Sequence, residues 1–267
     1  MFATALAGPA RSGRTLGIMA CGLFLGIALS RPVASLVAGL AGWRAVYLGS
    51  GLALLATGLC LYRFLPGRPP AQGRLGWGAL VASLWPLLRF PLLVRRSLLS
   101  WGAFFSFGMF WSTVPLSLAG HLRVTQGHIT AFALAGLVTP PCMLLVGNLL
   151  DRGLGRQILV GALGCALAAC ALLVGEPTLL GVFMASALLL DPASSAVTVS
   201  IQQKILFGAP AEARGRLNSL NISMNFLGGA PGATLGPWLL TRCGLASVAL
   251  AGALLLACLF CCALKAR

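Results

Sequence analysis

The chain has 267 residues, of which 58% are hydrophobic and only 9% are charged. Soluble domains carry charge on about 25% of their residues, so this composition excludes a soluble globular domain. The net charge is +15, but the basic residues stand in short clusters between long apolar stretches, which disfavours nucleic acid as a partner. The composition indicates an integral membrane protein in contact with the lipid bilayer.

Eight apolar stretches follow one another along the chain, each long enough, or nearly so, for a helix that spans a membrane. They are 16–41, 45–65, 97–119, 129–150, 158–174, 179–203, 217–240 and 246–264. A bilayer core needs about 20 apolar residues as helix, and backbone polar groups in lipid must pair within their own segment. The sequence therefore predicts an all-α polytopic membrane protein with eight transmembrane helices.

A basic segment at 66–96 separates the first two stretches from the last six. Its middle, Trp77 to Leu88, is either a helix in the membrane interface or a simple tether. If the N-terminus lies inside, nearly all basic residues outside the apolar stretches fall on the cytoplasmic side. The positive-inside rule then predicts that both termini are cytoplasmic.

Two charged residues lie well inside apolar stretches, away from their ends, where a charge is expensive unless it is paired or hydrated. Asp191 lies midway along 179–203 and could bind and release a proton, or could satisfy backbone groups that Pro192 frees. Arg31, in 16–41, could face an aqueous cavity, bond to carbonyls freed by Pro32, or pair with Asp191. Both are candidates for a substrate or proton pathway.

Polar amides and aromatic rings supply further candidates for that pathway. Asn221 and Asn225 share one helix face, where they either line a cavity or join helices. Trp101, Phe105 and Trp111 belong to an aromatic-rich stretch that would suit apolar or cationic substrates, although contact with lipid is a common alternative.

Small residues are concentrated in 217–240. Gly228, Gly232 and Gly236 recur every four residues, with Gly229 beside them. Small residues at this spacing let membrane helices approach closely, so we expect a packing seam.

The sequence offers no site for a cofactor or metal. The CxxC formed by Cys258 and Cys261 lies inside an apolar stretch, and His121 and His128 are not spaced with cysteine as a zinc site requires. No Walker sequence is present, and the apolar stretches hold no nucleophile with a histidine in reach. We therefore expect neither an enzyme nor a cofactor.

Four stretches resemble the C-terminal two-thirds of a major facilitator superfamily transporter, particularly of the bacterial drug:proton antiporter and arabinose-efflux-like branch. They are 14–44, 147–156, 190–203 and 214–236. The first departs from the usual pattern, because Arg31-Pro32 stands where the family has Gly-Pro and a following Gly-Gly pair is missing. The second, GNLLDRGLGR, looks like the family's signature cytoplasmic loop in its second-half copy.

The resemblance implies a major facilitator-type helix bundle truncated to eight helices. Residues 1–65 would be a remnant of the N-terminal half with two helices, 66–96 the basic cytoplasmic linker, and 97–267 a complete C-terminal half with six helices. The first four of the usual twelve helices would be absent. We therefore expect this chain alone to be incapable of transport.

The resemblance also implies a function for the full-length form. It would be a secondary active transporter of the bacterial inner membrane that exports a small amphipathic compound against proton influx by alternating access. The signature loop, with Gly147, Asp151, Arg152, Gly155 and Arg156, would hold one conformation of the transport cycle. The alternative is a non-transporting membrane fragment or an interaction partner of another subunit.

Overall fold

A computed structural model describes residues 12–64, 91–121, 134–175, 179–208 and 213–265, together with positions 78, 82, 83, 85, 86, 132 and 177. Within these residues the regular structure is helical throughout, and helices coincide with all eight of the predicted stretches. The predicted all-α fold is therefore confirmed for the described part of the chain. The linker predicted at 66–96 lies largely outside it.

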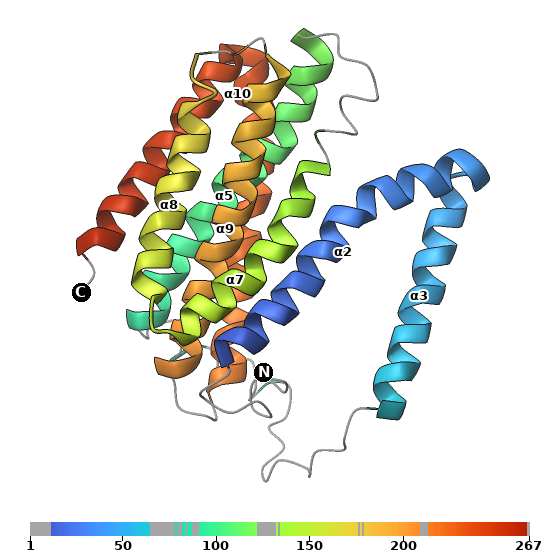
Figure 1. The fold of residues 1–267 in the computed structure, drawn as a ribbon, viewed down its shortest axis with the longest axis vertical. Coiled ribbons are helices and arrows are strands. Elements are labelled where there is room, and N and C mark those ends of the chain that lie inside the picture. Colours follow the sequence, from blue (N-terminus) through green and yellow to red (C-terminus); the bar gives the residue numbers. More distant parts are fainter. Residues whose placement is uncertain are drawn as a thin grey trace.

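The helices follow in this order: α2 (Ser12–Ala41), α3 (Trp43–Phe64), α5 (Pro91–His121), the 3₁₀ helix η3 (Ala135–Val138), α7 (Thr139–Asp151), α8 (Gly155–Ala171), α9 (Leu180–Gly208) and α10 (Arg214–Lys265). Two of the predicted stretches fall within α10. This helix is interrupted at Gly244, whose φ of 80° and ψ of 176° are not helical. The chain turns back there, so α10 contributes two antiparallel arms to the bundle (Figure 1).

Among the described residues, four helices are both long and apolar enough to cross a membrane. They are Arg14–Ala41, Trp43–Phe64, Leu180–Ile205 and Arg214–Lys265. The apolar helices Ala135–Asp151 and Gly155–Ala171 are shorter. These lengths support a multi-pass membrane protein, and the count of eight crossings stays a prediction.

The helices form a bundle of five with a two-helix extension. α5, α7, α8, α9 and α10 pack together, whereas α2 lies against α7 near its own start and then leans away (Figure 1). α3 packs beside α2, stands apart from the bundle and has no buried residue. Of an apolar segment of 18 residues in α9, 61% is buried, whereas the corresponding share in α2 is 6%. α9 is therefore the central helix.

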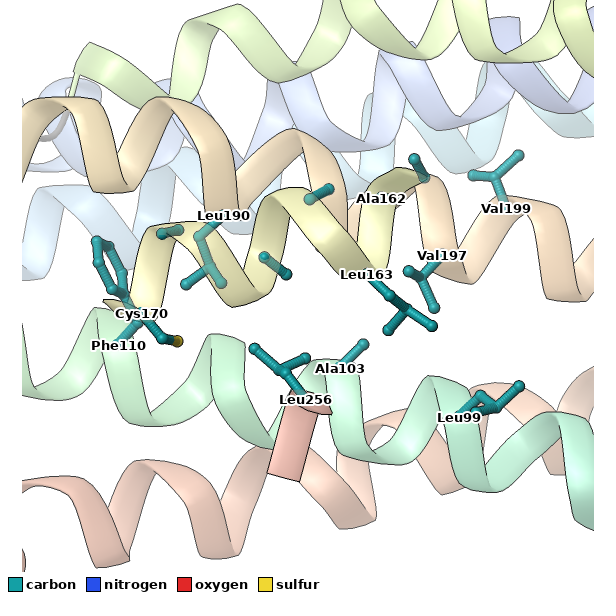
Figure 2. Packing of buried hydrophobic residues seen from close by; sticks show 14 of the residues in the cluster. Leu99, Ala103, Phe110, Ala162, Leu163, Cys170, Leu190, Val197, Val199 and Leu256 are labelled. Carbon is teal, nitrogen blue, oxygen red and sulfur yellow. The ribbon is translucent and has the colours of Figure 1, made fainter. Parts of the chain in front are cut away.

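The interior of the bundle is aliphatic. Leu163 of α8, Leu190 of α9 and Leu256 of α10 are fully buried, and the three helices meet α5 around them (Figure 2). Lipid tails are as apolar as leucine, so such a core holds membrane helices together by close packing more than by expulsion of water.

Close packing is tightest between α5 and the first arm of α10. Gly228, Gly232 and Gly236 are buried there, and a Cβ added at any of them would overlap atoms of α5. At Gly232 the overlap is with the carbonyl oxygen of Phe105, and the carbonyl carbon would be only 2.9 Å away. Gly229 differs, because its added Cβ would find its nearest neighbour at 3.7 Å. The two helices thus approach backbone to backbone along this glycine seam.

Candidate functional site

Asp191 lies in the middle of α9 and is only 7% exposed. Its carboxylate accepts two hydrogen bonds from other helices. The indole Nε1–H of Trp111, on α5, donates to Oδ1 over 3.1 Å, and the hydroxyl of Thr139, the first residue of α7, donates to Oδ2. A buried charge requires such partners, because each unsatisfied lone pair would carry the full cost of desolvation.

Four helical elements meet at this carboxylate. A Cβ added to Gly136, in η3, would lie 3.7 Å from Oδ2 of Asp191 and 3.9 Å from Cβ of Ala28 in α2. Val138, the N-cap of α7, makes no side-chain capping hydrogen bond, and the hydroxyl of the next residue, Thr139, donates to Asp191. The site therefore joins α9 to α5, to η3 and to the start of α7, and α2 lies on the other side of η3.

Aromatic rings surround the indole that contacts Asp191. The ring of Trp111 lies 5.3 Å from that of Phe132, 5.8 Å from that of Phe110 and 6.3 Å from that of Phe107. Phe132 and Phe110 are almost completely buried, while Trp111 and Phe107 keep part of their surface exposed. These four residues form an aromatic wall beside the carboxylate.

The other predicted aromatic residues lie elsewhere on α5. The rings of Trp101 and Phe105 stack with their centroids 5.4 Å apart, and the backbone of both residues contacts the glycine seam of α10. The structure therefore places Trp111, but neither Trp101 nor Phe105, next to Asp191. Sequence reasoning missed Thr139, which contacts Asp191, and Phe132, which contacts Trp111. A lone hydroxyl and a phenylalanine in an apolar stretch give no signal of their own.

Arg31 lies within α2, directly before Pro32. Its side chain is outside the described part of the chain, so its predicted pairing with Asp191 stays a prediction.

Asn221 and Asn225 are buried on the face of α10 that carries the glycine seam. The hydroxyl of Ser97, on α5, donates to Oδ1 of Asn221 over 3.1 Å. Among the described residues, Nδ2 of Asn221 and Oδ1 of Asn225 have no hydrogen-bond partner. These amides face α5, and neither bonds to Asp191 in the described structure.

The signature loop forms the second feature that could act in function. Oδ2 of Asp151, at the end of α7, accepts the backbone N–H of Arg14 over 2.7 Å. Amides in the first turn of a helix have no intrahelical partner and favour a negative charge, so Asp151 caps α2. Nearby, a Cβ on Gly17 would come within 3.0 Å of Cα of Gly147. The start of α2 is thus held tightly against the end of α7.

The rest of the loop contacts other helices. Nη2 of Arg156 donates to the backbone oxygen of Leu264 over 3.0 Å, which satisfies a carbonyl near the end of α10. Gly155 is buried, and an added Cβ would lie 3.6 Å from Cε of Lys204 on α9. Arg152 is exposed and directly follows α7. One short loop therefore ties together α2, α7, α9 and α10.

Comparison with known proteins agrees with this architecture. The chain matches the Major Facilitator Superfamily over residues 1–233. It is 29% identical over 255 residues to the uncharacterized transporter YgaY of Escherichia coli (strain K12). The aligned region covers 94% of this chain and 64% of that protein. It is 30% identical over 240 residues to a probable transporter of Streptomyces coelicolor, which covers 85% of this chain and 53% of that protein.

The chain therefore spans less than two thirds of the length of these relatives. Because the family match extends over most of its sequence, the chain belongs to the Major Facilitator Superfamily.

Proposed function

We propose that the chain is part of a secondary active transporter, and that the full-length transporter exports a small amphipathic compound in exchange for protons by alternating access. The observation on which this proposal depends is Asp191, a buried carboxylate where four helical elements meet. Ionisable residues inside membrane helices are costly and mark ion or substrate pathways. Transporters of this kind place such sites near the bilayer midplane, between units that move against each other.

The partners of Asp191 suit a carboxylate that gains and loses a proton. An indole N–H can only donate, whereas a threonine hydroxyl can donate or accept. In the ionised state both Trp111 and Thr139 donate to Asp191. When the carboxylate takes up a proton, the new O–H can donate to Thr139 after the hydroxyl rotates, and the attraction to Trp111 weakens. Protonation thereby alters the contacts of α9 with α5 and α7.

The aromatic wall supports an amphipathic substrate. Trp111 and Phe107 keep part of their ring surface exposed beside Asp191. Aromatic faces attract cations, and a nearby carboxylate adds an opposite charge. An organic cation and a proton would then compete for Asp191, which is the elementary requirement for exchange of one for the other.

The loop from Gly147 to Arg156 supports a gating role. Its contact with the start of α2 includes one carboxylate hydrogen bond and a glycine pair, Gly17 and Gly147. Both contacts can be lost without unpacking the five-helix bundle. We propose that the start of α2 and the end of α7 separate in one state of the transport cycle and are in contact in the other.

The proposal includes a topology. Eight crossings would place 66–96 and both termini in the cytoplasm of a bacterial cell, with the chain in the inner membrane. Residues 1–65 would belong to one half of the transporter and 97–267 to the other.

The decisive experiment uses the full-length transporter that contains these residues, in proteoliposomes, with ethidium as the amphipathic cation and a pH-sensitive dye inside. Addition of ethidium should release protons into the compartment from which it is removed. Asp191→Asn keeps one acceptor oxygen, replaces the other by an NH₂ donor and cannot take up a proton, so proton movement should stop. Glu176→Gln is the control, because it removes an acid from the chain but leaves Asp191 in place.

Two results would count against the proposal. Proton exchange that survives in Asp191→Asn would exclude this carboxylate as the proton site. A well-folded, unmodified full-length protein that moves neither ethidium nor protons would favour a non-transporting partner of another subunit.

A further inference from the structure

Buried and half-buried polar side chains continue from Asp191 towards one end of α9. Ser194, Thr198 and Gln202 follow Asp191 at intervals of three, seven and eleven residues, so they lie on one face of the helix. At about 1.5 Å per residue, this row is about 16 Å long, roughly half of a bilayer core. It leads from the proposed proton site to the end of α9 that we place in the cytoplasm.

Side chains of α5 extend this row across the helix interface. Oγ of Ser100 lies 3.5 Å from Oγ1 of Thr198, which itself donates to the backbone oxygen of Ser194 over 3.1 Å. Ser97 is one turn from Ser100 and donates to Asn221. α5 thus places two hydroxyls between the polar residues of α9 and those of α10.

At the end of the row, α9 and α10 are joined by amides. Nε2 of Gln202 donates to Oδ1 of Asn218 over 2.7 Å. Asn218 is one turn from Asn221 on α10. We call the whole set the polar file: Ser194, Thr198, Gln202, Ser97, Ser100, Asn218 and Asn221.

Two buried members of the polar file each carry one polar atom that has no hydrogen-bond partner among the described residues. Among the described residues, Oγ of Ser194 and Nδ2 of Asn221 make no hydrogen bond, although both side chains are 1% exposed. A buried donor or acceptor without a partner costs roughly 1–3 kcal/mol, and buried water is the usual way to remove that cost. The positions of these groups therefore favour water along the file.

The other side of Asp191 is different. There the carboxylate meets Trp111, whose neighbours Phe110 and Phe132 are buried and apolar. At the end of the bundle where the polar file reaches Gln202, the direct route between α2 and α7 is closed by the contact of Gly17 with Gly147. The polar file is a separate route, because it runs between α5, α9 and α10.

We propose that the polar file is a hydrated proton path, in which water links Asp191 to the cytoplasm while α2 and α7 remain in contact. Its side chains are uncharged hydroxyls and amides that both donate and accept, so they can hand a proton along through water but provide no charge to retain an ion. The inference rests on the proposed function of Asp191 as the proton site.

Hydrogen–deuterium exchange of the Asp191 carboxyl tests the path. The chain has only four acidic side chains, so the infrared C=O stretch of protonated Asp191 can be assigned by its loss in Asp191→Asn. The full chain, in lipid at acidic pH, is transferred to D₂O, and the shift of this band is followed in time. Thr198→Val, nearly identical in shape, and Gln202→Leu, at the end of the file, should each slow the shift by about tenfold or more, because each replaces a hydrogen-bonding step by apolar surface.

Ser186→Ala is the matched control. Ser186 is a buried hydroxyl on the same helix, on the other side of Asp191, and it bonds within α9 to the backbone oxygen of Val182. Its removal should leave the exchange rate unchanged. Equal rates in the unmodified chain, Thr198→Val and Gln202→Leu would overturn the path, as would slow exchange in all of them. A chain with fast, file-dependent exchange but no loss of proton transport in Asp191→Asn would instead refute the proposed function and leave the path intact.

Discussion

Replacement of Gly232 by alanine tests whether the glycine seam sets the distance between α5 and α10. The added Cβ would overlap the carbonyl oxygen of Phe105 and lie 2.9 Å from its carbonyl carbon. These are backbone atoms in the middle of α5, so no rotamer change can make room. The helices must move apart along the buried seam, or the chain must bear the overlap.

Gly229 provides a matched control on the same helix. Its added Cβ would lie 3.7 Å from the carbonyl oxygen of Phe104, which is ordinary van der Waals contact. Both substitutions gain the same helix propensity, about 1 kcal/mol. Overpacking of a tight interface costs roughly 1–3 kcal/mol. We therefore expect Gly232→Ala to be less stable than Gly229→Ala by about 1–3 kcal/mol, since the propensity gain cancels in the comparison.

Thermal unfolding of both variants in the same detergent, followed by tryptophan fluorescence, measures this difference. Gly229→Ala should melt at or above the temperature of the unmodified chain, and Gly232→Ala clearly below Gly229→Ala. Equal melting temperatures would show that the two helices do not approach as closely as the structure indicates, and that the seam does not determine their packing.

Three further predictions concern the turn, the loop and the site. Gly244→Ala should lower the melting temperature and cost about 1–3 kcal/mol, because its backbone conformation is essentially restricted to glycine, while Gly215→Ala, in open space, should not. Asp151→Ala should speed amide deuterium exchange in the first turn of α2, and unchanged protection there would refute the cap. Trp111→Phe should shift the infrared carboxyl band of Asp191, because the indole hydrogen bond is lost; an unmoved band would exclude that contact.

The helices were predictable from the sequence because the signal for a membrane helix is local. An apolar stretch of about 20 residues must pair its own backbone groups, whatever its neighbours are. Thus α3 forms over Trp43–Phe64 although none of its residues is buried. Asp191 was found as a candidate for a similar reason, since a charge in an apolar helix is costly in any fold.

The partners of that charge could not be found in this way. Trp111 and Thr139 lie 80 and 52 residues from Asp191 along the chain, and the amide of Arg14 lies 137 residues from Asp151. Periodicity shows that residues share a helix face, but it does not show which neighbouring helix that face meets.

The amides of α10 illustrate the division between sequence and tertiary structure. The spacing of Asn221 and Asn225 placed both on one face, in line with Gly228 and Gly232, and left open whether this face lines a cavity or meets a helix. The rotation of α10 about its axis turns this face towards α5, since the backbone of α5 lies directly against Gly228 and Gly232. The sequence by itself determined the helical class, the apolar stretches and the one acid at their centre, because these depend on the transfer of each segment into lipid. Only the tertiary structure decided which side chains meet that acid, because this depends on how helices distant in sequence pack against one another.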